Sequence, residues 1–335
     1  MPPSTRPFPF AALLAGATTV FALGAAPPAS AGDGVIELNH ACATSTGCVP
    51  GDAPGYPITL DGVAGRSYRM TSDLRIPLAT DGIVISFSDA RIDMGGFMIA
   101  QACTFPQSGQ GVPLCTLDGD ADGIRVTSNV AYKGTTVRNG TIYYMSGDGL
   151  FLGSDARIDD VTVRENGGRG MYLGSGSTVR HAIAEGNGNW GIYGAGTISH
   201  STARSNFDGI VWSGTITNNT TVGNDNYGFH VSSNSTITAN TALDNDGSGI
   251  YCTNGCTISN NTSARNGNGV HDHGIECFDD CNVIGNTVRD SSGFGLQLFT
   301  GSSTFMQNNI NDSGSGAVNG GINKGMNACD GALCP

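Results

Sequence analysis

Side chains that can transfer protons are concentrated between residues 230 and 276 of this chain. His230, Tyr251, His273 and Glu276 fall in this stretch, together with Arg265. Histidine, tyrosine and glutamate act as proton donors and acceptors, and arginine neutralises the carboxylate of an acidic ligand. The set therefore suits proton abstraction from an acidic sugar. The alternative interpretation is a polar, solvated bulge without catalysis.

A second candidate site is a run of alternating aspartates, Asp118, Asp120 and Asp122. Oxygen ligands at alternate positions, followed by a glycine turn, match the first half of a calcium-binding loop. The second half does not match, because Asn129 stands where a bidentate glutamate is expected. Calcium bound in another geometry is one interpretation. The other is an acidic turn that leads into a strand at 124–126.

These side chains are distributed over a sequence repeat. Ten glycines between residues 123 and 322 are each followed by an apolar residue, and successive glycines lie 18 to 26 residues apart. A repeat of this length without a helical period indicates stacked β coils. The repeat glycines are Gly123, Gly149, Gly170, Gly191, Gly209, Gly228, Gly249, Gly274, Gly295 and Gly321.

Each coil is expected to contain three short strands joined by turns. In the coil that begins at Gly228, the expected strands are 228–231, 236–238 and 241–243. A single coil cannot bury its own apolar face, so coils stack as parallel strands ~4.8 Å apart. Stacking predicts two asparagine ladders: Asn219, Asn240, Asn261 and Asn286 at one corner, and Asn187, Asn206, Asn224, Asn245 and Asn266 at the return turn.

The first strand of each coil places the candidate side chains. The residue after the repeat glycine points into the core, so the next residue points out. The predicted outward column is Arg125, Phe151, Tyr172, Tyr193, Val211, His230, Tyr251, Glu276, Gln297 and Asn323. Glu276 is then ~5 Å from Tyr251 and ~10 Å from His230 at the backbone.

The early part of this column is aromatic. An outward row of Phe151, Tyr172 and Tyr193 on a stiff sheet can stack on the apolar faces of sugar rings, so we predict that these residues bind substrate. The alternative is that aromatic residues simply favour strands.

The glycine-apolar starts, the Thr-Ile second strands and the asparagine corners resemble the right-handed parallel β-helix superfamily, which includes pectate-lyase-like enzymes. The resemblance covers about residues 55 to 325 and predicts an all-β solenoid of about ten coils. It implies a lyase or epimerase, in which a basic or tyrosine side chain acts with a group that neutralises a carboxylate. The only lysines, Lys133 and Lys324, lie outside the column, so no family active site carries over.

Four segments are predicted. Residues 1–31 resemble a secretory signal peptide, with an apolar run and the cleavage signal Ala29-Ser30-Ala31. Residues 32–75 are expected to form an N-terminal cap, 76–325 the β-helix, and 326–335 a disulfide-pinned tail. The mature protein is therefore expected to be secreted, either to the periplasm or to the extracellular space.

Ten cysteines in an exported chain indicate disulfides rather than a metal cluster. Five bridges between sequence neighbours are predicted: 42–48, 103–115, 252–256, 277–281 and 329–334. Cys252 and Cys277 lie at matching places in successive coils, so a bridge between them is the alternative.

Composition limits the partners. The formal net charge is −12 with 13% charged residues, which argues against nucleic acid and against attraction to anionic lipids. No mature segment is long and apolar enough to insert into a membrane.

The sequence predicts an exported carbohydrate-binding protein whose partner is a polysaccharide, with lyase or epimerase activity as the finer hypothesis. A non-catalytic surface or matrix protein, or an adhesin, is the alternative. The oligomeric state is not indicated.

Overall fold

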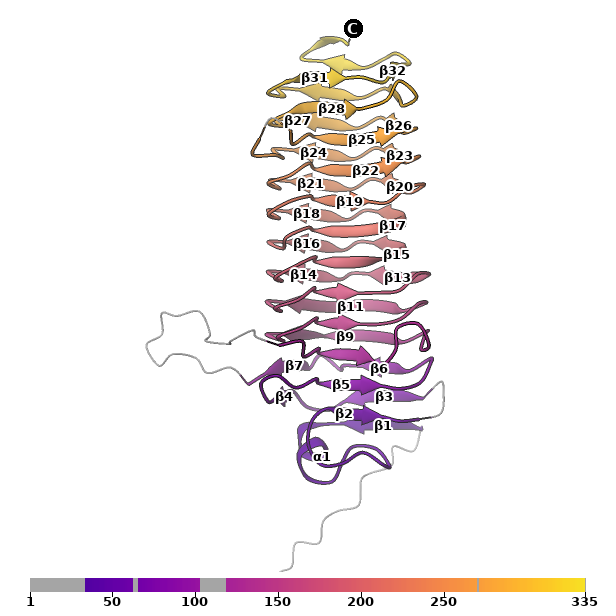
Figure 1. The fold of residues 1–335 in the computed structure, drawn as a ribbon, viewed down its shortest axis with the longest axis vertical. Coiled ribbons are helices and arrows are strands. Elements are labelled where there is room, and N and C mark those ends of the chain that lie inside the picture. Colours follow the sequence, from indigo (N-terminus) through magenta and orange to yellow (C-terminus); the bar gives the residue numbers. More distant parts are fainter. Residues whose placement is uncertain (1–33, 63–65, 103–118, 270, 335) are drawn as a thin grey trace, which may run out of the picture.

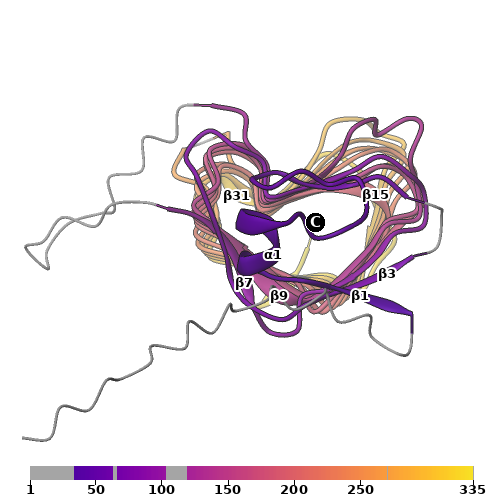
Figure 2. The same cartoon turned by 90° about the horizontal axis from the view of Figure 1, so that it is seen from below.

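The computed structural model describes residues 34–62, 66–102, 119–269 and 271–334. The predicted signal peptide, the Cys103–Cys115 pair and Asp118 lie outside these ranges. The described chain is a column of stacked coils with a three-sided cross-section (Figures 1 and 2). Each side is a parallel sheet, named here sheet I, sheet II and sheet III in the order in which a coil passes through them.

Sheet I contains twelve parallel strands within the described residues, close to the ten coils expected. In stacking order they are β2 (Ile58–Leu60), β5 (Ile83–Ile85), β8 (Ile124–Val126), β10 (Leu150–Phe151), β12 (Met171–Tyr172), β15 (Ile192–Ser199), β17 (Ile210–Thr217), β19 (Phe229–Val231), β22 (Ile250–Asn254), β25 (Ile275–Asp279), β28 (Phe294–Leu298) and β31 (Gly316–Asn319).

Sheet II follows the first corner of each coil. It contains β1 (Val35–Leu38), β3 (Ser67–Met70), β6 (Arg91–Asp93), β9 (Thr136–Tyr143), β11 (Arg157–Arg164), β13 (Ser177–Arg180), the second halves of β15 and β17, β20 (Thr236–Thr238), β23 (Thr257–Ser259), β26 (Asn282–Ile284), β29 (Thr304–Met306) and β32 (Ile322–Asn323). Parallel pairing thus begins at Val35, inside the segment expected to form the cap.

Sheet III closes the coil. It contains β4 (Leu74–Ile76), β7 (Met98–Gln101), the second halves of β9 and β11, β14 (Ile183–Glu185), β16 (Thr202–Arg204), β18 (Thr220–Val222), β21 (Thr241–Leu243), β24 (Thr262–Ala264), β27 (Thr287–Arg289), β30 (Asn309–Asn311) and β33 (Ala328–Cys329). A final antiparallel strand, β34 (Ala332–Leu333), pairs with β33.

The predicted core is confirmed. The residues after nine of the repeat glycines are fully buried and stack in one inward column: Ile124, Leu150, Met171, Ile192, Ile210, Phe229, Ile250, Ile275 and Leu296. Alternation along each strand then sends the next side chain outward, as expected for a half-buried sheet.

The tenth dipeptide does not start a coil in sheet I, and this expectation was wrong. Ile322 is 43% exposed and pairs with Thr304 in sheet II. The coil after β28 reaches sheet I earlier, with Val318 opposite Leu296 and Asn319 opposite Gln297. Asn319 therefore replaces Asn323 as the last member of the outward column, because strand pairing rather than the Gly-Ile dipeptide sets the register.

Close contact between coils explains the repeat glycines. A Cβ atom on Gly228 would lie 2.7 Å from the Gly249 carbonyl oxygen of the next coil and 2.8 Å from Nδ2 of Asn245. Any side chain there would push the coils apart, so glycine is required at this position.

Both asparagine ladders are confirmed and extend further than predicted. In the corner ladder, Oδ1 of Asn240 accepts from the backbone N–H of Asn219 at 2.8 Å and from its Nδ2 at 3.0 Å. The same bonding continues through Asn308 to Asn327. The return-turn ladder begins one coil earlier, at Asn166. Buried amides thereby satisfy backbone groups that the turns leave free.

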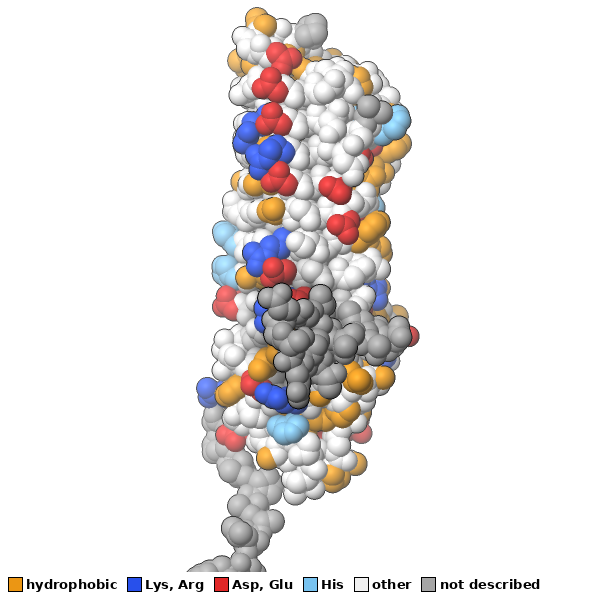
Figure 3. Space-filling model, turned by 90° about the vertical axis from the view of Figure 1, so that its left-hand side faces the viewer, with side chains coloured by type: hydrophobic (Ala, Val, Ile, Leu, Met, Phe, Trp, Pro, Cys, Tyr) orange, Lys and Arg blue, Asp and Glu red, His pale blue; other side chains and the backbone are white. Residues whose placement is uncertain are grey.

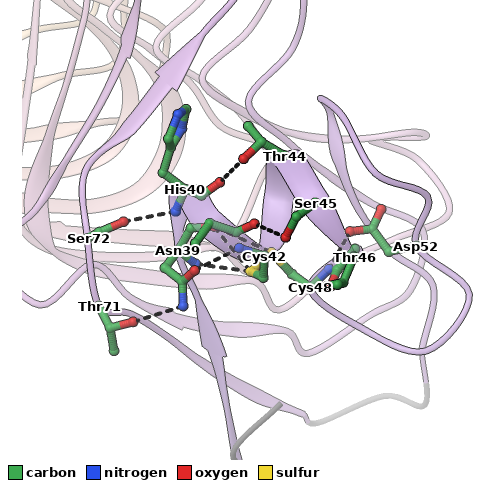
Figure 4. The surroundings of a disulfide bond; sticks show 12 residues. Asn39, His40, Cys42, Thr44, Ser45, Thr46, Cys48, Asp52, Thr71 and Ser72 are labelled. Atoms are coloured by element: carbon green, nitrogen blue, oxygen red, sulfur yellow. Dashed lines mark hydrogen bonds between the residues drawn. A yellow bond between two sulfur atoms is a disulfide. The ribbon is translucent and has the colours of Figure 1, made fainter. Parts of the chain in front are cut away.

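A short helix, α1 (His40–Ser45), lies across the N-terminal end of the column (Figure 2). Asn39 caps it by accepting from the backbone N–H of Cys42 at 2.8 Å (Figure 4). The Cys42–Cys48 disulfide ties the helix to the following turn, where Asp52 accepts from the N–H of Cys48 at 2.9 Å. This segment covers the open end of the apolar core.

The eight described cysteines form four of the predicted local disulfides: Cys42–Cys48, Cys252–Cys256, Cys277–Cys281 and Cys329–Cys334. Cys252 and Cys277 are register partners in sheet I, but each pairs within its own coil. Among the described residues, no helix has the length and apolar character needed to cross a bilayer.

Replacement of a ladder asparagine should destabilise the fold. Asn240→Ala leaves the N–H and Nδ2 of Asn219 without their acceptor, at a cost of about 1–3 kcal/mol in the free energy of unfolding. Urea unfolding monitored by circular dichroism measures this cost. Asn268→Ala is the matched control, because the Asn268 side chain is exposed on a return turn. Equal effects of the two substitutions would contradict a structural role for the ladder.

Candidate functional site

The outward column of sheet I forms a continuous line of side chains over ten coils. Strand register places Arg125, Phe151, Tyr172, Tyr193, Val211, His230, Tyr251, Glu276, Gln297 and Asn319 next to one another in that order. Of the predicted site residues, Phe151, Tyr172, Tyr193, His230, Tyr251 and Glu276 therefore lie on one face. Phe151 and Glu276 are six coils or ~29 Å apart.

The aromatic members stack on each other rather than facing outward. The ring centroids of Phe151 and Tyr172 are 5.0 Å apart with 13° between their planes, and those of Tyr172 and Tyr193 are 5.0 Å apart with 9°. Trp190 continues the stack at 4.7 Å from Tyr193. Neighbouring rings cover each other's faces, so the accessible surface consists of ring edges and phenol hydroxyls. This corrects the expected sugar stacking on open ring faces.

Further along the column, His230 and Tyr251 make a polar aromatic cluster with Tyr227. Their rings pack edge-on at 5.0 Å, and the Tyr227 ring stacks on that of Tyr251 at 4.8 Å. Asp208 is almost fully buried, and its Oδ2 lies 3.5 Å from Nδ1 of His230. This contact orients the imidazole, so that Nε2 is the nitrogen available on the partly exposed side of the ring.

The two phenols in this cluster are proton donors. Burial raises the pKa of Tyr227 to about 12, and burial together with the Glu276 carboxyl raises the pKa of Tyr251. Both hydroxyls therefore hold their protons at neutral pH.

Glu276 and His273 are buried, contrary to the expectation of an exposed bulge. Glu276 and His273 are 7% and 5% exposed. Oε2 of Glu276 accepts from the Ser248 hydroxyl at 2.7 Å, and burial raises the pKa of Glu276. The pKa of His273 is lowered by burial, and its Nδ1 accepts from the N–H of Phe294 at 2.9 Å.

A shallow pocket opens beside Glu276, lined also by His271, Gln297, Phe299 and Asn319. Because Nδ1 of His273 is occupied by a backbone donor, its neutral ring carries the proton on Nε2 and acts as a donor. The structure thus brings His230 next to Tyr251 and Tyr251 next to Glu276, with His273 at the edge of the pocket.

Arg265 is not brought to this cluster. It stands at the corner after β24, where Nε and a terminal nitrogen bind the two carboxylate oxygens of Asp244 at 2.6 and 2.7 Å. The Asp244 carboxylate raises the pKa of Arg265. Figure 3 shows acidic and basic side chains following one another along one side of the column.

Sequence reasoning missed a second column, which stands one residue before each repeat glycine. Most of its side chains accept the backbone N–H of the equivalent residue in the next coil: Asp81 from Asp122, Asp122 from Asp148, Asp148 from Arg169, Asp208 from Tyr227, Ser248 from His273, and His273 from Phe294. The repeat itself contained the signal, because polar and ionisable residues recur at this fixed position.

At its N-terminal end this second column forms an acidic cleft. Asp122 and Asp148 lie side by side with Arg125 and Arg169. Arg169 pairs with Asp148 at 2.8 Å and places its guanidinium 4.3 Å from the Tyr172 ring centre, which joins the cleft to the aromatic stack. Burial, together with the Asp148 and Asp81 carboxylates, raises the pKa of Asp122 to about 7.

These contacts bear on the calcium hypothesis. One oxygen of Asp122 accepts from the N–H of Asp148 at 2.7 Å and the other lies 3.8 Å from Nε of Arg125. A carboxyl group that holds a proton near neutral pH and faces an arginine is a poor calcium ligand. Asp120 is exposed at the mouth of the cleft. Calcium at Asp118, Asp120 and Asp122 stays a prediction.

The comparisons with known proteins agree with this architecture. Residues 195–311 match the family model described as "Right handed beta helix region". The chain is a right-handed parallel β-helix repeat protein. A sequence search of curated proteins finds no match.

Three solved structures resemble this β-helix. The A-modules of the mannuronan C-5 epimerases AlgE4 and AlgE6 from Azotobacter vinelandii are both 15% identical. AlgE4 has a TM-score of 0.52 over 77% of this chain and 86% of that chain. AlgE6 has a TM-score of 0.50 over 78% and 72%. A variant of the periplasmic alginate epimerase AlgG has a TM-score of 0.55 at 12% identity, over 76% and 72%. At these identities the likeness is one of fold.

Asp122 should make the stability of the β-helix depend on pH. Its folded pKa of about 7 lies above the ~3.9 of an unfolded aspartate, so the folded state binds the proton more tightly. This stabilisation is complete below about pH 4 and is lost as the pH rises through about 7, with ~4 kcal/mol as its upper limit.

Asp122→Asn keeps an oxygen acceptor for the Asp148 N–H but cannot titrate. The free energy of unfolding of the variant, measured in urea across this pH range, should therefore fall less with rising pH than that of the parent. Asp120→Asn, at the exposed neighbouring aspartate, is the control. Parallel curves for Asp122→Asn and the parent would show that Asp122 titrates normally.

Proposed function

We propose that this protein is an exported polysaccharide-binding enzyme that removes a proton from a uronic acid unit, as a lyase or an epimerase. The polysaccharide lies along the outward column of sheet I. The observation that carries the proposal is the juxtaposition of His230, oriented by buried Asp208, with the protonated hydroxyl of Tyr251.

His230 acts as the base. A base must present an unprotonated nitrogen to the sugar, and the Asp208 contact at Nδ1 fixes which nitrogen faces the ligand. Asp208 also stabilises the imidazolium that forms when the proton is taken. Because Asp208 is held by the backbone N–H of Tyr227 at 3.1 Å, its position is set by the stack.

Tyr251 acts as the acid. It lies one coil from His230, ~4.8 Å along the axis, and its raised pKa keeps the hydroxyl protonated until a partner accepts the proton. Donation to the ring carbon from the side opposite the base gives epimerisation. Donation to the departing glycosidic oxygen gives elimination.

The substrate carboxylate must be neutralised before its neighbouring C–H becomes acidic enough. Arg265 is bound to Asp244, and Glu276 takes this role in the proposal. Burial raises the pKa of Glu276, and a carboxylate entering the adjacent pocket would raise it further, so that the acid form of Glu276 can donate a hydrogen bond to that carboxylate. Gln297, one coil further, adds amide donors beside it.

The aromatic stack and the acidic cleft extend the surface beyond the reacting unit. Ring edges and the hydroxyls of Tyr172 and Tyr193 offer contacts to sugar units two to three coils away from His230. The similar solved structures of mannuronan and alginate epimerases support a polysaccharide as the ligand. The local disulfides support export.

A substrate screen tests the activity. The mature protein is incubated with acidic and neutral polysaccharides; absorbance of unsaturated ends detects elimination, and proton NMR in deuterated water detects epimerisation. On the responsive substrate, His230→Gln and Tyr251→Phe should each lower kcat by about 10²–10⁴-fold, the range for loss of a proton-transfer group. Asp208→Asn should lower kcat with a smaller change in KM.

Two further variants separate roles. Tyr172→Ala should weaken binding of long chains more than short ones, because this ring lies away from the reacting unit. Arg265→Ala should change kcat/KM little, and a loss as large as that of His230→Gln would return Arg265 to the site. If the parent binds a polysaccharide but turns over none, the non-catalytic adhesin is the better description.

A further inference from the structure

Two histidines and two aspartates meet at the corner between sheets II and III, away from the outward column of sheet I. Asp159 and Asp160 lie in β11, where the strand turns this corner. His181 occupies the same corner one coil further, between β13 and β14, and His200 the next, between β15 and β16. Asp160, His181 and His200 all have φ between 50° and 53°, so the same left-handed turn directs each of them.

The ligating atoms of three of these residues are already gathered. Nδ1 of His181 lies 3.1 Å from Oδ1 of Asp159 and 3.8 Å from Oδ1 of Asp160. One ligand atom from each of the three residues lies within 4.8 Å of the others. Two ligands ~2.1 Å from a tetrahedral ion are ~3.4 Å apart, a value between the two measured distances. His200 stands one coil further, with its ring centroid 5.6 Å from that of His181.

We propose that this corner binds a divalent ion of the zinc type. Imidazole nitrogen with carboxylate oxygen suits Zn²⁺, whereas Ca²⁺ prefers six to eight oxygens. The side chains of Asp159, Asp160 and His181 are 41%, 69% and 55% exposed, so the ion is reached directly from solvent. Water completes the coordination.

Binding must displace two present interactions. The hydrogen bond between His181 Nδ1 and Asp159 is lost when the metal takes this nitrogen, and the proton of the neutral imidazole then stands on Nε2. A terminal nitrogen of Arg180 lies 4.0 Å from Oδ2 of Asp159, a loose contact that competes with a cation. Removal of the arginine charge should therefore strengthen zinc binding.

Isothermal titration of the tag-free protein with ZnCl₂ tests the site. The parent should bind one ion at this corner. His181→Asn should weaken this binding by at least about tenfold, the loss that even outer-shell partners of a metal cause. Asparagine tolerates the left-handed backbone, so the variant keeps the fold. His200→Asn should weaken binding less, and Arg180→Gln should strengthen it severalfold.

His40→Asn is the matched control, because His40 is an exposed histidine whose ring contacts Tyr56 and no carboxylate. It should leave zinc binding unchanged. The proposal is overturned if the parent does not bind zinc, if His181→Asn binds as the parent does, or if CaCl₂ at equal concentration displaces the ion. That last outcome would indicate only general attraction of cations to acidic residues.

Discussion

The regular spacing of the parallel coils, ~4.8 Å from strand to strand, is the constraint on which this structure depends. Each backbone N–H bonds to the coil beside it, so a residue must fit directly against its equivalent in the next coil. At the start of sheet I this leaves no room for a side chain, as the contacts of a Cβ on Gly228 demonstrate. At two corners it places asparagine on asparagine, and these buried amides bond both to each other and to carbonyls of the strands that end at the corner. The repeat glycine and the ladder asparagine are thus two consequences of one spacing.

The same spacing decides which chemistry the surface can hold. A column of equivalent positions brings side chains from residues about twenty apart into contact, without a pocket formed by separate domains. The side chains of the residues before the repeat glycines make two kinds of contact. Most accept a hydrogen bond from a backbone N–H of the next coil, and some also contact side chains of the outward column. Asp208 bonds the N–H of Tyr227 and lies against His230, so the element that stabilises the stack also positions the histidine.

The sequence predicted the columns well, because glycine spacing and strand alternation are periodic. It predicted the inward residues, both asparagine ladders and the adjacency of His230, Tyr251 and Glu276. It failed where a turn overrides the period. Glu276 and His273 beside the return turn before β25 are buried, and the corner after β24 directs Arg265 to Asp244. The direction of a turn depends on its own packing, which no repeat in the sequence encodes. The prediction of open ring faces failed for a similar reason. Each aromatic ring stacks on the ring of the next coil, and this contact is more favourable than leaving the ring face exposed to solvent.

Like residues suit a stacked column, since amides bond amides and rings cover rings, whereas like charges repel. Positions where unlike residues follow one another therefore lack this mutual stabilisation. Along the outward column the stacked rings end after Tyr193, and Val211, His230, Tyr251 and Glu276 follow, each different from the last. In a folded protein, positions that break the regular pattern while the rest of the fold keeps it are often functional sites. This reasoning, independent of any resemblance, selects the same stretch of sheet I as the proton-transfer geometry does.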